Sequence, residues 1–169
     1  MKTFIIKCFS LFAVSLLAGV TSNAEQWRGI TPLKSTRADV ERLLGKPEPE
    51  PEGMSFLATY KLRTEEVNVL YAIKSLCNEP ERCDCLVPDD TVIEIYVESK
   101  VKMKFSSLDI DKTTFDRFPL VENTSVIFYR NAEAGLTYAV SEKEDKVLYI
   151  QYSPTVKDCE TIKRKTTKT

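Results

Sequence analysis

Alternating apolar and polar residues predict two groups of β-strands in this chain. Side chains on one face of a strand recur every second residue, and three such runs lie between residues 55 and 98. Three more lie between residues 125 and 152 and are joined by short polar turns. A sheet with one buried face and one solvent-exposed face is typically antiparallel. The expected strands are 55–63, 66–73, 91–98, 125–130, 135–141 and 146–152.

The segment 33–47 predicts a short helix whose two ends are both encoded. A threonine or serine followed three residues later by an acid forms a capping box, and apolar residues at i, i+3 and i+4 share one face. A glycine and then a proline end such a helix. In chain order the signals are the caps Ser35 or Thr36, the acid Asp39, the apolar Val40, Leu43 and Leu44, and the terminators Gly45 and Pro47.

Residues 109–118 are similar to this opening segment. Asp111 falls opposite Thr36 and Phe115 opposite Val40, and a proline follows again. We therefore predict a second helix and a tandem repeat of one helix and three strands, at 33–98 and 109–153. The alternative is coincidence. The expected fold class is α+β, with short helices packed on antiparallel sheet.

The first 24 residues have the pattern of a secretory signal peptide. Residues 1–7 carry two lysines and no acid, residues 8–20 are apolar, and Ser22 and Ala24 are small residues at the −3 and −1 positions. The alternative is an uncleaved anchor. A lipobox needs a cysteine where Val20 stands, so we expect no lipid anchor. The mature protein is expected to be soluble and exported, to the periplasm or the extracellular space.

Charge and length place few limits on the partner. Cleavage after Ala24 removes Lys2 and Lys7 and no acid, so the formal charge moves from −1 to −3. This mild value gives no reason to expect a nucleic-acid partner, and no later apolar run is long enough to span a bilayer. We expect one domain over 25–160, with a cysteine-bearing insertion at 74–90 and a disordered basic tail at 161–169.

Four cysteines remain after signal cleavage, and an even number in an oxidising compartment predicts two disulfides. Cys83 and Cys85 are too close to pair with each other, so one bonds to Cys77 and the other to Cys159. We favour Cys77–Cys85 with Cys83–Cys159, and the exchanged pairing is the alternative. A metal or redox site is disfavoured because the chain has no histidine and no Cys-x-x-Cys motif.

The residues that usually carry catalysis are missing. Without histidine there is no histidine base and no Ser-His-Asp or Cys-His nucleophile. The five glycines do not form a phosphate-binding loop, and acidic pairs such as Asp89 and Asp90 are expected at this acid content. We therefore predict a protein that is not an enzyme and that has no cofactor and no metal.

The pattern of the opening helix resembles the BamE/SmpA family of small outer-membrane assembly lipoproteins. It is also similar to the tandem helix-plus-sheet units of the beta-lactamase inhibitor protein type. Residues 27–33 and 87–93, with the same helix, look like a group of uncharacterised exported bacterial proteins. The resemblance implies a helix-plus-sheet fold and a binding role. It is carried by Thr36, Asp39, Val40, Leu44, Gly45 and Pro47.

These observations favour a non-catalytic protein-binding or envelope-associated module whose protein partner is unknown. Tyr96 and Tyr149 fall at polar-facing positions of their strands, so we predict that they contribute to an exposed binding surface. Core packing is the alternative for both, because a tyrosine is commonly half-buried with its hydroxyl in water. The alternative function is a carrier that holds a small apolar or anionic ligand between sheet and helices.

Overall fold

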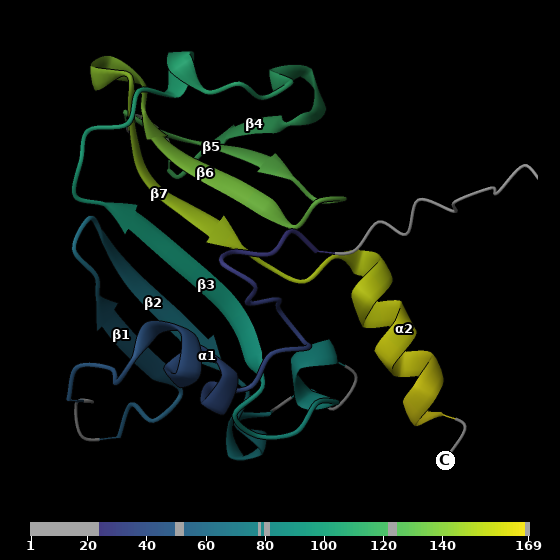
Figure 1. The fold of residues 1–169 in the computed structure, drawn as a ribbon. Coiled ribbons are helices and arrows are strands. Elements are labelled where there is room, and N and C mark those ends of the chain that lie inside the picture. Colours follow the sequence, from purple (N-terminus) through teal and green to yellow (C-terminus); the bar gives the residue numbers. More distant parts are fainter. Residues whose placement is uncertain (1–23, 50–52, 78, 80–81, 122–124, 168–169) are drawn as a thin grey trace, which may run out of the picture.

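One antiparallel sheet organises the computed structural model (Figure 1). The structure describes residues 24–49, 53–77, 79, 82–121 and 125–167. Within these ranges the sheet has seven strands in the order β1-β2-β3-β7-β6-β5-β4, so β3 and β7 join its two halves. The strands are β1 (Leu57–Lys61), β2 (Glu65–Tyr71), β3 (Val92–Ser99), β4 (Asp116–Pro119), β5 (Val126–Asn131), β6 (Leu136–Ser141) and β7 (Lys146–Tyr152). The α+β class and the six expected strands are confirmed, and β4 is additional.

The helix α1 (Arg37–Leu44) begins and ends as its sequence predicts. Thr36 is the N-cap, and its side chain and that of Asp39 form the reciprocal capping box. Gly45 follows the last turn with a φ of 87°, a value that glycine adopts without strain. Val40 is buried against the sheet, whereas Leu43 is 45% exposed and does not join the core.

The hydrophobic core lies on one side of the sheet. In the first half, α1 and residues 27–30 cover β1, β2 and β3. In the second half, residues 103–115 cover β5, β6 and β7. The register joins the two halves on the same side, because Ile95 pairs with Tyr152 and Tyr152 pairs with Leu136. The other side of the sheet is free of these covering segments.

The insertion between β2 and β3 contains the 3₁₀ turns η1 (Lys74–Leu76) and η2 (Cys83–Cys85). The cysteines have the pairing that we favoured, Cys77 with Cys85 and Cys83 with Cys159. The second disulfide joins η2 to the helix α2 (Val156–Thr166). A small apolar cluster that includes Leu33, Val87 and Ile162 supports the same junction.

The predicted second helix is wrong. Residues 109–118 form the 3₁₀ turn η4 (Lys112–Thr114) followed by β4. Asp111 caps only this turn, and Phe118 pairs with Phe128 of β5 instead of continuing a helix. Among its described residues, the second half therefore has no counterpart of α1, and the tandem repeat is not confirmed.

The basic tail also needs a correction. We expected residues 161–169 to be disordered, but α2 continues to Thr166. Its N-cap Thr155 and the acid Asp158 form a second capping box, and three cations occupy the last turn, where the helix dipole favours them. The predicted signal peptide lies outside the described residues apart from Ala24. Within the described ranges, no helix is long and apolar enough to cross a membrane.

Candidate functional site

Four aromatic side chains lie on the side of the sheet opposite the core. The register places Tyr149, Ala139, Phe128 and Phe118 in one row across β7, β6, β5 and β4. Tyr96 of β3 joins them, because its ring centroid is 5.7 Å from that of Tyr149. Phe128 lies 6.4 Å from Tyr149 and 5.4 Å from Phe118, centroid to centroid. We call Tyr96, Tyr149, Phe128 and Phe118 the aromatic cluster.

A polar row lies beside the aromatic cluster and crosses all seven described strands. Residues that pair across antiparallel strands face the same side of the sheet. The pairings begin with Asp116 opposite Arg130 on the β4 edge and end with Asn68 opposite Thr59 on the β1 edge. The complete row is Asp116, Arg130, Thr137, Gln151, Tyr96, Asn68 and Thr59. This side of the sheet therefore presents aromatic rings next to hydrogen-bonding groups.

Tyr96 belongs to both groups, because its ring contacts Tyr149 and its hydroxyl forms hydrogen bonds. Its hydroxyl donates to Glu94 Oε2 at 2.6 Å and accepts from Gln151 Nε2 at 3.2 Å. Burial, and then the bond to Glu94, raise the pKa of Tyr96. Burial also raises the pKa of Tyr149. Both hydroxyls stay protonated at neutral pH, so Tyr96 is held as a donor to Glu94.

Two adjoining clefts run over this side of the sheet, and we call them together the groove. The larger has a volume of about 500 Å³ and the smaller about 250 Å³, and they share Arg82, Asp84, Ile93 and Glu94. The larger continues over Gln151, Thr137, Arg130, Phe128 and Phe118. The smaller continues over Phe56, Leu70, Tyr71, Ala72, Ile73, Leu76 and Cys77.

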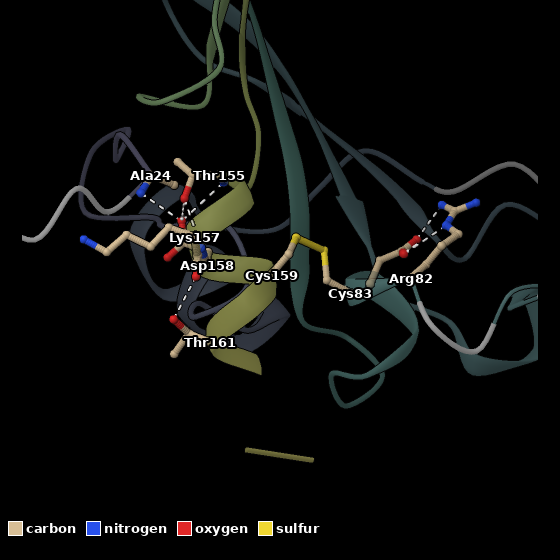
Figure 2. Close-up of a disulfide and its surroundings, with 9 residues drawn as sticks. Ala24, Arg82, Cys83, Thr155, Lys157, Asp158, Cys159 and Thr161 are labelled. Atoms are coloured by element: carbon tan, nitrogen blue, oxygen red, sulfur yellow. Dashed lines mark hydrogen bonds and ion pairs between the residues drawn. A yellow bond between two sulfur atoms is a disulfide. The ribbon is translucent and has the colours of Figure 1, made fainter. Parts of the chain in front are cut away.

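The insertion and α2 form the wall of the groove, and covalent and polar contacts fix that wall (Figure 2). Cys83 and Cys159 both line the larger cleft. At the first turn of α2, Asp158 Oδ2 accepts hydrogen bonds from Thr155 Oγ1 at 2.6 Å and from the Ala24 amide at 3.0 Å. Lys34 Nζ lies 3.6 Å from Asp158 Oδ1. These contacts attach α2 to the start of the described chain as well as to the insertion.

The charge of Asp158 is stabilised despite its burial. Burial acts to raise the pKa of this carboxyl group. Hydrogen bonds from Thr155 and from the Ala24 amide, and the nearby charge of Lys34, act in the opposite direction and outweigh it. The pKa therefore lies below its ordinary value, and Asp158 is ionised at neutral pH.

The charges in the groove differ in how they are neutralised. Arg82 donates two hydrogen bonds to Asp84, at 2.6 and 3.1 Å, and so has its partner within the wall. Arg130 is exposed on β5, and no acidic side chain of the described residues forms an ion pair with it. The groove thus combines aromatic rings with a cation that is available to a ligand.

Among the described residues, no group of three or more cysteine, aspartate or glutamate side chains is arranged to hold a metal ion. The polar groups of the groove are guanidinium, carboxylate, amide and hydroxyl groups. These groups are suited to hydrogen bonding of a ligand. The chain offers no histidine to act as a general base beside them.

The structure brings together the two tyrosines that the sequence singled out, and both are half-buried. Sequence reasoning missed Phe118, Phe128, Arg130 and Gln151. A signal existed for three of them. Phe128 and Arg130 are two residues apart on one predicted strand, and Gln151 is two residues from Tyr149 on another, so each pair shares a face. Phe118 was missed because residues 109–118 were predicted to form a helix.

Comparison with known proteins gives a fold and no family. No family model matches the chain, and no curated protein matches it. A solved structure, that of a DUF4309 family protein (YjgB) from Bacillus subtilis, is similar with a TM-score of 0.53 and 17% sequence identity. The match covers 78% of this chain and 86% of that one. At this level of identity the likeness extends to the fold alone.

Proposed function

We propose that this protein is a non-catalytic binding module that holds an extended segment of another protein in the groove. The observation that carries the proposal is that Phe118 and Phe128 line the groove and belong to the aromatic cluster, whose ring contacts continue across β3, β7, β5 and β4 on the side away from the core. Aromatic side chains that combine apolar area with a polar tip are enriched where proteins bind one another. The resemblance of the opening helix to BamE/SmpA-type units supports the same role.

The dimensions of the groove favour an extended segment over a compact ligand. Its lining comes from six adjacent strands, β2, β3, β7, β6, β5 and β4. Neighbouring strands lie about 4.8 Å apart, so the groove is about 24 Å long, which matches about seven residues of extended chain. Exposed backbone amides of such a segment would find partners in the polar row.

A carrier of a small apolar or anionic molecule is the second candidate. The larger cleft, at about 500 Å³, has the volume that small-ligand sites commonly have. However, Arg82, Asp84, Glu94 and Arg130 contribute to its lining, whereas an apolar cargo favours an enclosed apolar pocket. An anionic cargo is the version of this candidate that the lining favours.

We further propose that the protein works outside the cytoplasm. The two disulfides support this location, because such bonds persist in oxidising compartments. The signal-peptide pattern in residues 1–24 supports it as well.

Selection from a displayed library of random peptides tests the binding proposal. Enriched peptides would be synthesised with a fluorophore, and their affinities measured by anisotropy. Phe118 is 38% exposed on an edge strand, so Phe118→Ala should leave the fold intact and weaken binding about tenfold. Val101→Ala is the matched control, because Val101 is 63% exposed and does not line the groove. Equal binding by wild type and Phe118→Ala would contradict the proposal.

A further inference from the structure

Arg130 has an exposed guanidinium that forms no ion pair with an acidic side chain of the described residues. Several other arginines of the described chain do have an acidic partner. The pairs are Arg28–Glu65, Arg37–Asp90, Arg42–Asp39, Arg82–Asp84 and Arg117–Glu142.

The position of Arg130 places this cation inside the groove. The residue belongs to the polar row and lines the larger cleft together with Phe118 and Phe128. Asp116 lies opposite it on β4 but lines a separate hollow with Thr114 and Asn131. Among the described residues, Asp116 forms no ion pair with Arg130, and Arg130 lines the cleft that a ligand would occupy.

We infer that the segment bound in the groove carries a carboxylate that pairs with Arg130, next to an apolar or aromatic side chain that packs on Phe118 and Phe128. This inference rests on the proposed function. A guanidinium matches a carboxylate with two parallel hydrogen bonds, which gives geometric selectivity as well as attraction. The partner is thus a stretch of protein that combines an acidic residue with an aromatic or aliphatic one.

The spacing between β4 and β5 gives the spacing expected in the ligand. Phe118 of β4 and Arg130 of β5 lie on neighbouring strands, which are about 4.8 Å apart. A segment that crosses the strands advances by about 3.4 Å per residue, so one or two residues span this distance. The acidic residue should therefore stand one or two positions from the apolar one.

Nearby acids favour a carboxylate over a more highly charged group. Glu94 and Asp84 line the same cleft as Arg130. Their negative charge would oppose a doubly charged phosphate more strongly than a single carboxylate. A phosphorylated segment is therefore an outcome that the test must separate from an acidic one.

The test is a parallel selection of random displayed peptides on the wild-type protein and on Arg130→Glu. The wild type should enrich peptides with Asp or Glu one or two positions from an aromatic or large aliphatic residue. Arg130→Glu should instead enrich Lys or Arg at that position. Because Arg130 is exposed, the variant should fold, and its melting temperature is the check on folding.

Affinity measurements with one enriched acidic peptide complete the test. Arg130→Glu should weaken its binding about tenfold, and replacing the acidic residue of the peptide by its amide should weaken binding to the wild type by a similar factor. A phosphoserine version should bind the wild type no more tightly than the acidic one. Tighter binding of the phosphoserine peptide overturns the inference. Equal affinity of the acidic peptide for wild type and Arg130→Glu overturns it as well.

The two proposals fail in different ways. Peptides whose binding depends on Phe118 and not on Arg130 would leave the groove as a peptide site and remove the acidic anchor. Selection that enriches no peptide at all, or only peptides indifferent to Phe118→Ala, would remove both. Groove-dependent binding of a neutral oligosaccharide such as chitohexaose in place of any peptide would also remove both.

Discussion

Cys83 and Cys159 are separated by 76 residues in the sequence, and their Cα atoms are 5.1 Å apart in the structure. The bond between them joins the insertion to α2, and both cysteines line the groove. The other disulfide, Cys77–Cys85, closes a loop of only 8 residues inside the insertion. One bond therefore connects distant parts of the groove wall, and the other shapes a local turn.

Removal of the two disulfides should destabilise the protein unequally. In the chain-entropy model a cross-link stabilises by restricting the unfolded chain, and the effect grows with loop length. For loops of 76 and 8 residues it amounts to about 4.5 kcal/mol for Cys83–Cys159 and about 2.5 kcal/mol for Cys77–Cys85. Urea unfolding of the two double serine variants measures the difference. A larger loss for the Cys77–Cys85 variant would contradict this account.

Gly135 should tolerate no side chain. It has a φ of 67°, and a Cβ there would stand 2.1 Å from the backbone oxygen of Ser153, whose amide donates a 2.7 Å hydrogen bond to the Gly135 carbonyl. Because the obstacle is backbone, β6 and the end of β7 would have to separate. Gly135→Ala should lower the free energy of unfolding by about 3 kcal/mol.

Gly29→Ala is the matched control for this prediction. Gly29 has a similar φ of 83°, but no atom lies within 4 Å of the place that a Cβ would take there. Only the backbone strain remains, so the cost should be about 1 kcal/mol. Thermal or urea unfolding of both variants separates the cost of the steric clash from the cost of the backbone conformation. Equal losses in the free energy of unfolding would show that the close contact between Gly135 and Ser153 is unimportant.

The strands were predictable because their signal is local. Along β2 and β3, apolar residues alternate with polar ones, and this period identifies a strand whatever its neighbours are. Phe115 and Phe118 are three residues apart and so matched a helical face. In the structure Phe118 pairs with Phe128, and that pairing depends on a partner ten residues away, which periodicity does not specify.

The helix α2 could have been predicted from the same evidence as α1. Thr155 and Asp158 have the spacing of Thr36 and Asp39, and both pairs form capping boxes. For the candidate site, local alternation identified Tyr96 and Tyr149 as sharing the polar side. It did not give the strand order, and that order decides that Phe128 and Arg130 lie beside them. The candidate site therefore depends on the order of the strands in the sheet more than on a local sequence motif.

Asp158 should make the stability of the protein depend on pH in the acid range. Its pKa in the folded protein lies below the ordinary value of 3.8. The contribution of the Asp158 charge to the free energy of unfolding is therefore fully present above pH 3.8. It is lost as the pH falls through the lower pKa that this group has in the folded protein. Asp158→Asn should cost about 1 kcal/mol at pH 7, and the difference from wild type should shrink below about pH 4. Cleavage after Ala24 would remove one donor, so in a chain that begins at Glu25 the effect rests on Thr155 and Lys34.

Asp39→Asn is the comparison variant for Asp158→Asn. Asp39 holds the same place in the capping box of α1, and hydrogen bonds from Thr36, with Arg42, lower its pKa to about 2. However, the side chain of Asp39 is 41% exposed, against 9% for that of Asp158, so water screens its interactions more. Urea unfolding between about pH 2.5 and 7 should therefore show the smaller change for Asp39→Asn, and the reverse order would show that burial of Asp158 adds nothing.

Pro119 should protect the edge of the sheet at β4. The amide of Leu120 donates a hydrogen bond to the carbonyl of Val126. Hydrogen-bonded pairs alternate along antiparallel strands, so residues 118 and 116 also bond to β5. The backbone N–H and C=O positions of residues 117 and 119 therefore point away from the sheet. A proline at an outward position removes the donor that another strand would need. This protection matters because Phe118, Leu120 and Val121 are exposed apolar residues at the same edge.

Pro119→Val should therefore increase self-association without unfolding the protein. Valine restores the outward amide and favours extended backbone, so a second copy gains a place to add a strand beside an apolar patch. Light scattering over a concentration series should show larger particles than wild type. Pro88→Val makes the same change at an exposed loop position away from this edge and should scatter like wild type. If both variants stay as dispersed as wild type, the exposed residues 118–121 are protected by something other than Pro119.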